Sequence, residues 1–212
     1  MEQPTIIINV AQSLDGYISG HNGKRIQISC NEDMKRVANL RKQCDGVMVG
    51  KNTALFDNPN LKSDSSDDRK FRIIIDRELG IPLTHNIYDG SYPTIIITTR
   101  TDGKKIKKLS YVNPKEFNMT SIMQALYDFG IRKLLVEGGA MTIISILRSC
   151  RVDQFFVYVG PVIMGSGKTE VRQGRVCIYL LFHKNSLREM RKLLLYHSGI
   201  RRNLSCQESS KY

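Results

Sequence analysis

The chain has 212 residues, of which 41% are apolar and 25% are charged. This length and composition favour one domain with a substantial hydrophobic core, and they exclude collagen-like, disulfide-dense and disordered classes. No apolar run approaches the ~20 residues that a membrane span needs. The five cysteines are an odd number without a CxxC pair, so we expect reduced thiols in a cytoplasmic protein.

The net charge of +12 is unevenly distributed. Residues 171–212 carry 9 Lys and Arg against 2 Asp and Glu, whereas the first 170 residues contribute only +5. No basic stripe alternates with aromatic residues, so we expect no specific nucleic-acid partner. A mobile basic end would still retain polyanions weakly in a salt-sensitive way, so a polyanion-binding protein remains an alternative.

The sequence contains six short runs that are rich in Ile and Val. In these runs neighbouring residues are both apolar, so both faces of a strand would be apolar, which is typical of strands covered on both faces of a parallel sheet. They are Thr5–Val10, Gly46–Gly50, Arg72–Asp76, Thr94–Thr99, Leu134–Glu137 and Gln154–Val159.

Helical patterns lie between several of these runs. Asn31 is positioned to cap the first helix. Thr120 is positioned to cap the second helix, which ends at Gly130. A third helix follows Gly139. Strands that alternate with helices predict an α/β fold with a mostly parallel central sheet and helices on both faces. Ligands of such sheets bind at the carboxyl ends of the strands, so functional residues are expected directly after them.

The segment Glu137-Gly138-Gly139 follows one of these strands and opens a helix. Paired glycines let backbone amides approach an anion at the positive helix N-terminus, so Gly138 and Gly139 are candidate phosphate contacts. Glu137 is a candidate acceptor for sugar hydroxyl groups. A tight strand–helix turn without a ligand is the alternative interpretation.

Other motifs give weaker signals. Gly167-Lys168-Thr169 resembles the end of a P-loop, but Val162 occupies the position that requires glycine, so we reject an ATPase. Asp15-Gly16 and Asp57-Asn58-Pro59 are also typical of turns. The four histidines form no HxH or HExxH pattern, and we expect no metal site.

Taken together, four stretches resemble the reductase of riboflavin biosynthesis. They are NVAQSLDGYIS, ISCNEDMKRVANLRKQCDGVMVGKNTALFDNPNL, RIIIDRELGIPL and LLVEGGAMTIISILRSCRVDQFFVYVGPVIMGSGKT, and they cover residues 5–169 in the order of the family. The resemblance implies a single-domain dihydrofolate-reductase-like fold, a homodimer and NADPH as cofactor. The implied reaction reduces the ribosylamino side chain of 2,5-diamino-6-ribosylamino-4(3H)-pyrimidinone 5′-phosphate to ribitylamino.

The resemblance also assigns site residues, position by position. Cofactor contacts are implied at Thr53, Asp57, Gly139, Ala140, Met141 and Thr142. Substrate contacts are implied at Arg41, Leu61 and Glu137. Two departures stand out: Asn58 replaces the family's second Asp, and Asp64 lies near the position of a bacterial arginine, so the substrate phosphate needs another cation.

Several roles stay open. Asp15, Glu137 and water are the candidate proton donors to the imine nitrogen of the ring-opened sugar. Arg77 follows a strand where a cation can meet the 2′-phosphate of NADPH, although an exposed arginine without a ligand explains it equally well. A dihydrofolate-reductase-like enzyme that reduces a pterin or another imine is the alternative enzyme.

The basic end of the chain departs from the family. We expect residues 1–170 to form the reductase domain and residues 171–212 to form an atypical, partly helical or disordered segment, with helical spacing over Lys184–Tyr196.

Overall fold

The computed structural model of the chain describes residues 2–19, 26–62, 70–165, 170–171 and 178–183. The expected helix in Lys184–Tyr196 and the Gly-Lys-Thr loop at 167–169 lie outside these residues. Among the helices that are described, none combines the length and the apolar character that crossing a bilayer requires.

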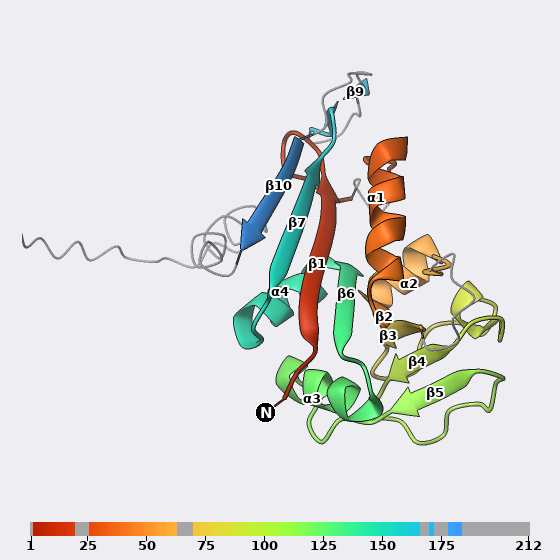
Figure 1. The fold of residues 1–212 in the computed structure, drawn as a ribbon. Coiled ribbons are helices and arrows are strands. Elements are labelled where there is room, and N and C mark those ends of the chain that lie inside the picture. The colour runs from red at the N-terminus through yellow and green to blue at the C-terminus, as the bar shows by residue number, and fades with distance from the viewer. Residues whose placement is uncertain (1, 20–25, 63–69, 166–169, 172–177, 184–212) are drawn as a thin grey trace, which may run out of the picture.

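The described residues form one eight-stranded sheet, in which seven strands are parallel and β10 runs antiparallel to β7 (Figure 1). In spatial order the strands are β10 (Ile178–His183), β7 (Gln154–Val159), β1 (Thr5–Gln12), β6 (Lys133–Gly138), β2 (Gly46–Gly50), β3 (Phe71–Ile75), β4 (Thr94–Ile97) and β5 (Leu109–Val112). Two short strands, β8 (Val162–Ile163) and β9 (Glu170–Val171), form a separate antiparallel pair.

All six expected strands are present, but the sequence did not predict the other two strands of the large sheet, β5 and β10, or the short pair β8 and β9. The edge strand β5 is half-buried along its length and contains polar residues, so it lacks the continuous apolar run of the inner strands. Strand β10 lies within the basic segment and pairs with β7 from Ile178 to His183. The sheet therefore extends past residue 169, the last residue that the resemblance covers.

The helices are α1 (Asn31–Lys42), α2 (Lys51–Asp57), α3 (Met119–Phe129) and α4 (Ala140–Ser149), with a 3₁₀ turn, η2, at Asn86–Tyr88.

Two of the N-caps expected for these helices were wrong. Asn31 is the first residue of α1, and Cys30 is its N-cap. Asn118, not Thr120, caps α3, because its side chain accepts a hydrogen bond from the amide of Ser121. Gly130 ends α3 in the left-handed conformation, as expected.

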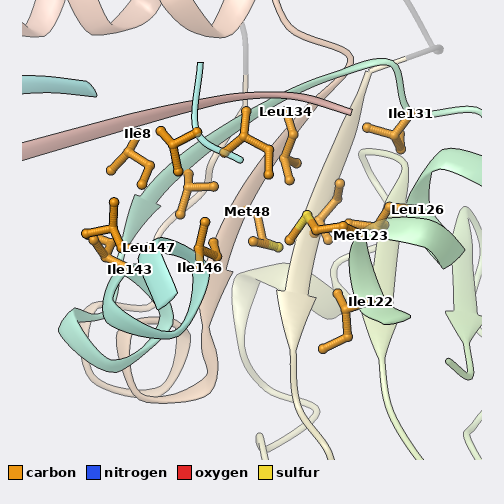
Figure 2. Close-up of a cluster of buried hydrophobic side chains, with 14 of the residues drawn as sticks. Ile8, Met48, Ile122, Met123, Leu126, Ile131, Leu134, Ile143, Ile146 and Leu147 are labelled. Atoms are coloured by element: carbon orange, nitrogen blue, oxygen red, sulfur yellow. The ribbon is translucent and has the colours of Figure 1, made fainter. Parts of the chain in front are cut away.

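Two hydrophobic cores lie on opposite faces of the sheet. On one face, α3 and α4 pack against alternate residues of the inner strands, such as Ile8, Met48 and Leu134 (Figure 2). On the other face, α1, α2 and η2 cover the intervening residues, such as Ile7 and Leu135. Helices thus cover both faces, which confirms the expected fold class.

The connections define where a ligand binds in such a sheet. From β1 the chain passes through α1, on one face, to β2, which lies beyond β6. From β6 it passes through α4, on the other face, to β7, which lies beyond β1. Because the chain leaves β1 and β6 in opposite directions, a crevice is expected at their carboxyl ends.

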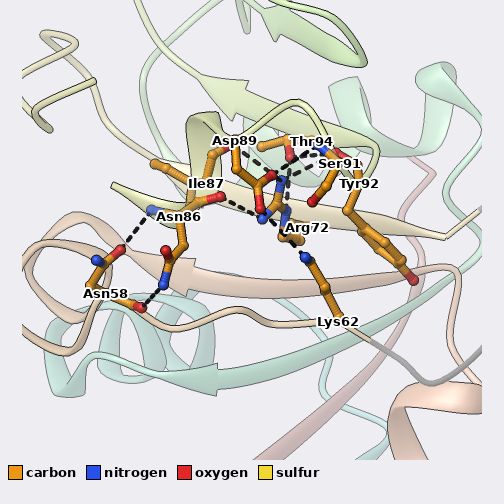
Figure 3. Close-up of polar contacts among 9 residues, drawn as sticks. All are labelled: Asn58, Lys62, Arg72, Asn86, Ile87, Asp89, Ser91, Tyr92 and Thr94. Atoms are coloured by element: carbon orange, nitrogen blue, oxygen red, sulfur yellow. Dashed lines mark hydrogen bonds and ion pairs between the residues drawn. The ribbon is translucent and has the colours of Figure 1, made fainter. Parts of the chain in front are cut away.

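A buried polar cluster lies near the amino ends of β3 and β4 (Figure 3). Arg72 is completely buried and donates to Thr94 Oγ1 at 2.9 Å and to Asp89 Oδ1 at 2.9 Å. It also donates to the backbone carbonyls of Asn86, Ile87 and Tyr92. Because every one of these partners is fixed by the fold, the guanidinium ties β3 to the η2 region.

Candidate active site

A cleft of about 710 Å³ opens at the carboxyl ends of β1 and β6. It is enclosed by the ends of these two strands, by α1, by α2, by the turn into α4 and by residues 18–19 and 26–29. Its volume is within the range of small-molecule sites, roughly 300–1,000 Å³. The fold therefore places the cleft at the switch point that the sheet topology predicts.

The turn between β6 and α4 forms one wall of the cleft. Gly139 is the N-cap of α4 and has a φ of 69°, which side chains other than glycine rarely adopt. A Cβ at Gly139 would come within 3.3 Å of Thr142 Oγ1 and 3.4 Å of Thr53 Oγ1. The first amides of α4 have no partner within the helix, so this wall fits the phosphate groups of a nucleotide cofactor.

The predicted cofactor residues are divided between this wall and its surroundings. Thr53 and Asp57 of α2, and Gly138, Gly139 and Ala140 of the turn, line the cleft. Thr142 is buried behind the turn, and a Cβ at Gly50 would collide with its hydroxyl group. Met141 is 67% exposed at the start of α4 and does not line the cleft.

Arg41 and Glu137 meet in the cleft. The guanidinium of Arg41 donates from Nε to Glu137 Oε1 at 2.7 Å and from Nη2 to Oε2 at 2.6 Å, a two-pronged ion pair. The Glu137 side chain is 11% exposed and that of Arg41 is 25% exposed. Because both carboxylate oxygens accept from Arg41, the pair presents itself to a ligand as one unit of zero net charge.

Asn58, the departure from the family pattern, has a local structural role. It ends α2 in the left-handed conformation with a φ of 40°, a conformation that Asn tolerates better than most residues. Its Oδ1 accepts from the amide of Asn86 at 2.8 Å, and its carbonyl accepts from Asn86 Nδ2. These bonds fix the end of α2 and with it the position of Asp57.

Three predicted residues lie away from the cleft. Leu61 is 3% exposed and packs in the core on the α1 face, with a positive φ of 50°. Asp15 accepts from the amides of Met164 and Gly165 and so holds the segment after β7. Arg77 is largely exposed, and its guanidinium lies 5.3 Å from the centre of the Phe117 ring.

The protonation of Asp15 bears on its suitability as a proton donor. Burial raises its pKa, but hydrogen bonds from Ser13, Gly165 and Met164 together outweigh this and lower the pKa below the ordinary value. Asp15 is therefore ionised near neutral pH and accepts hydrogen bonds instead of supplying a proton.

The sequence did not single out two cleft residues, Asn9 and Phe56. Asn9 is the one polar residue in the aliphatic stretch from Ile6 to Val10 of β1, and this exception was a visible signal. Phe56 lies on α2 with its side chain 65% exposed at the cleft, and no motif marks it. Within the described ranges, no group of three His, Cys, Asp or Glu residues could hold a metal ion.

Residues 4–192 match the family described as the RibD C-terminal domain. The chain belongs to this family. It is 30% identical over 181 residues to the 2,5-diamino-6-ribosylamino-4(3H)-pyrimidinone 5′-phosphate reductase of Archaeoglobus fulgidus, which covers 77% of this chain and 83% of that protein. It is 32% identical to the reductase of the same name from Aquifex aeolicus, over 78% of this chain and 80% of that protein.

Solved structures agree with this RibD-family assignment. The riboflavin biosynthesis reductase Rib7 of Saccharomyces cerevisiae superposes with a TM-score of 0.64 and 27% identity, covering 85% of this chain and 90% of that one. The deaminase/reductase of Thermotoga maritima gives a TM-score of 0.69 at 24% identity, and the match spans 82% of this chain but half of that longer protein. The fold is thus that of the solved riboflavin biosynthesis reductases, as the resemblance implied. The family match also continues to residue 192, beyond the expected limit of residue 169.

Proposed function

We propose that this RibD-family chain reduces the ribosylamino side chain of 2,5-diamino-6-ribosylamino-4(3H)-pyrimidinone 5′-phosphate to ribitylamino, with NADPH as cofactor. The names of the relatives from Archaeoglobus fulgidus and Aquifex aeolicus support this substrate. The observation that carries the proposal is the cleft itself, where a glycine turn suited to phosphate and the Arg41–Glu137 pair face the same space.

NADPH, when bound, supplies the hydride that reduces the imine carbon. The turn of Gly138 and Gly139 and the first amides of α4 would hold its phosphate groups, with Thr53 and Asp57 of α2 on the adjoining wall. Ala140, Met141 and Thr142 form the first turn of α4 and complete this group. Arg77 is the proposed contact of the 2′-phosphate, since it follows the end of β3 with its side chain largely exposed.

On the substrate side we assign the sugar hydroxyl groups to Glu137 and Arg41, which face the cleft together. Leu61 would act indirectly, because it lies in the segment that follows α2 and anchors that segment in the core on the α1 face. For protonation of the imine nitrogen we favour water. Asp15 is held ionised outside the cleft, and both oxygens of Glu137 accept from Arg41.

The remaining expectations extend this proposal. We propose a homodimer that works in the cytoplasm on a small phosphorylated pyrimidine, with no membrane or specific nucleic-acid partner. We further propose that residues 1–170 form the catalytic domain, and β10 of the following segment adds a strand to its sheet.

The decisive experiment is a turnover assay of the purified full chain. The diaminopyrimidine phosphate, dihydrofolate and a buffer blank are each mixed with NADPH, and oxidation of the cofactor is followed by absorbance. We expect turnover with the diaminopyrimidine and none with dihydrofolate. Turnover with dihydrofolate alone would favour the pterin reductase, and failure to bind NADPH saturably would favour a binding protein instead of an enzyme.

A further inference from the structure

The helix α2 is too short to hold its position alone. It has seven residues, and isolated helices shorter than about 12 residues are only marginally stable in water. It nevertheless carries residues that line the cleft, among them Thr53, Phe56 and Asp57. The contacts that fix its last turn therefore determine where these side chains lie.

Carbonyl groups at the end of α2 are capped from outside the helix. The last carbonyls of any helix lack a partner within it. The carbonyl of Leu55 lies 3.1 Å from His85 Nε2, and because a carbonyl only accepts, this nitrogen carries the hydrogen. Asn86 donates from Nδ2 to the carbonyl of Asn58 at 2.8 Å. His85 and Asn86, at the start of η2, thus cap the end of α2.

The side chain of Asn58 makes a second bond to the same segment. Its Oδ1 accepts from the backbone amide of Asn86 at 2.8 Å, so the two residues are joined in both directions (Figure 3). The atom that faces an amide N–H must be an acceptor, and both asparagine and aspartate supply an oxygen there. The φ of Asn58 is 40°, in the left-handed region where Asn and Asp are enriched among residues other than glycine. This position therefore requires an acceptor and a backbone conformation, but not an amide group as such.

The turn η2 is itself attached to the core. The buried guanidinium of Arg72 donates to the carbonyls of Asn86 and Ile87 at 2.7 Å and 3.4 Å. Ile87 and Tyr88 are both buried in the core on the α1 face. The end of α2 is therefore tied through η2 to the core of the protein.

The Asp57 carboxylate depends on this attachment for its position. It lines the cleft, yet it makes no hydrogen bond or ion pair with another described residue. A side chain without partners of its own is placed by its backbone, and Asp57 directly precedes Asn58. A backbone shift of about 1 Å is enough to break a hydrogen bond between such a side chain and a ligand.

We propose that Asn58 and Asn86 are positioning residues for the cofactor, because their paired hydrogen bonds hold the last turn of α2 where Asp57 can contact NADPH. The inference rests on the proposed function for the identity of the cofactor. It also gives a role to the departure at residue 58: the family's Asp and this chain's Asn hold the turn through the same kind of oxygen acceptor.

Two substitutions of Asn58 separate the acceptor from the backbone conformation. Asn58→Gly keeps the left-handed conformation but removes the acceptor, and it should weaken NADPH binding about fivefold, which corresponds to one ordinary hydrogen bond. Asn58→Asp keeps an acceptor and should weaken NADPH by at most about twofold. Asn60→Gly, the same substitution at an exposed position of the same loop, is the matched control and should change nothing. Equal losses for Asn58→Gly and Asn58→Asp would overturn the role of the acceptor.

Calorimetry on the full chain measures these affinities, with NADPH and the diaminopyrimidine phosphate titrated separately so that no turnover occurs. The affinity for the diaminopyrimidine phosphate should stay constant in each variant, because its proposed contacts lie on α1 and β6. Asn86→Ala removes the donor to the Asn58 carbonyl and should also weaken NADPH alone. Unchanged NADPH affinity in Asn86→Ala would overturn the role of Asn86.

A double-mutant cycle tests whether the effect passes through Asp57. Asn58→Gly should weaken NADPH in the wild-type background and add almost nothing in the Asp57→Ala background. Fully additive losses would overturn this route.

Hydrogen exchange tests the attachment without any cofactor. In the free chain, Asn58→Gly and Asn86→Ala should speed exchange of the α2 amides and leave the α3 amides unchanged. Unchanged exchange in α2 would overturn the proposal, and faster exchange in both helices would show a general loss of stability and overturn it as well.

The outcomes separate the positioning role from the proposed function. A wild-type chain that binds NADPH, and binds it more weakly with Asn58→Gly, yet shows no turnover of the diaminopyrimidine, would refute the reductase and keep the positioning role. Turnover by the wild type with unchanged NADPH affinity in Asn58→Gly would keep the reductase and overturn the positioning role. A wild-type chain that binds no NADPH would refute both.

Discussion

Two arginines on the same face of the sheet differ in how deeply they are buried and in which partners they bind. Arg72, near the amino ends of the strands, is completely buried, and its donors are satisfied by backbone carbonyls and by Thr94 and Asp89. Arg41, at the carboxyl ends, keeps a quarter of its side chain exposed and makes its two short bonds to Glu137 on the cleft wall.

The difference shows how position along parallel strands separates stability from function. Near the amino ends, loops and strands pack closely enough to satisfy a guanidinium entirely within the protein. At the carboxyl ends, the chain departs in opposite directions from β1 and β6, and the space between leaves a charged pair accessible to a ligand. We therefore expect loss of Arg72 to damage folding and loss of the Arg41–Glu137 pair to damage binding.

The largest effect is expected from Arg72→Met. Removing the guanidinium leaves the carbonyls of Asn86, Ile87 and Tyr92 without this donor and leaves Asp89 with Ser91 and Lys62 as its partners. Each buried acceptor left unsatisfied costs about 1–3 kcal/mol, so the unfolding free energy should fall by roughly 3–5 kcal/mol. Urea unfolding of the full chain measures it. Arg100→Met, at an exposed pair with Asp102, makes the same substitution and should leave the unfolding free energy nearly unchanged. Equal changes in the two variants would contradict the structural role of Arg72.

Glu137→Gln is expected to act on catalysis instead of stability. Loss of a charge-assisted hydrogen bond costs about 1.5–3 kcal/mol, so substrate KM should rise or kcat should fall by tenfold or more. NADPH affinity should stay nearly constant, and the unfolding free energy should change less than in Arg72→Met. Steady-state kinetics and NADPH titration measure the two effects. A collapse of cofactor binding would place Glu137 in the cofactor site or in the fold.

The Arg72 cluster should also make stability depend on pH under acid conditions. Burial raises the pKa of Asp89, but hydrogen bonds from Ser91 and Arg72 outweigh this and hold the pKa well below its ordinary value. Because the folded pKa lies below the unfolded value of about 3.9, this stabilisation is complete above roughly pH 5 and is lost progressively as the pH falls further. Unfolding free energies of wild type and Asp89→Asn, measured between about pH 6 and pH 3, should converge toward the acid end. A constant difference would contradict the linkage.

The smallest effect is expected at Arg77, an arginine that neither buries its guanidinium nor lines the cleft. Arg77→Ala should weaken NADPH severalfold and leave NADH affinity unchanged, since only NADPH carries the 2′-phosphate. Fluorescence titration with both cofactors measures the ratio. Equal losses for both, or none, would show that Arg77 is a surface residue that lies over Phe117 without a cofactor role.

The sequence alone determined the six expected strands of the sheet and several of the residues that line the cleft. Gly46–Gly50 and Gln154–Val159 were predicted with the bounds that the structure has, because a strand buried on both faces leaves a continuous apolar run that is readable locally. The turn at Gly139 was also readable, because paired glycines between a strand and a helix mark a required backbone conformation.

Only the tertiary structure decided the partners of the charged residues. Arg41 and Glu137 lie 96 residues apart in the sequence. The order of the strands brings them together, and the local sequence pattern around neither residue encodes that order. The same holds for Arg36 and Asn9, 27 residues apart, and for β10, whose apolar run was obscured by the basic residues around it. Periodicity reports which face of an element is buried, whereas a side-chain hydrogen bond depends on which distant element packs against that face.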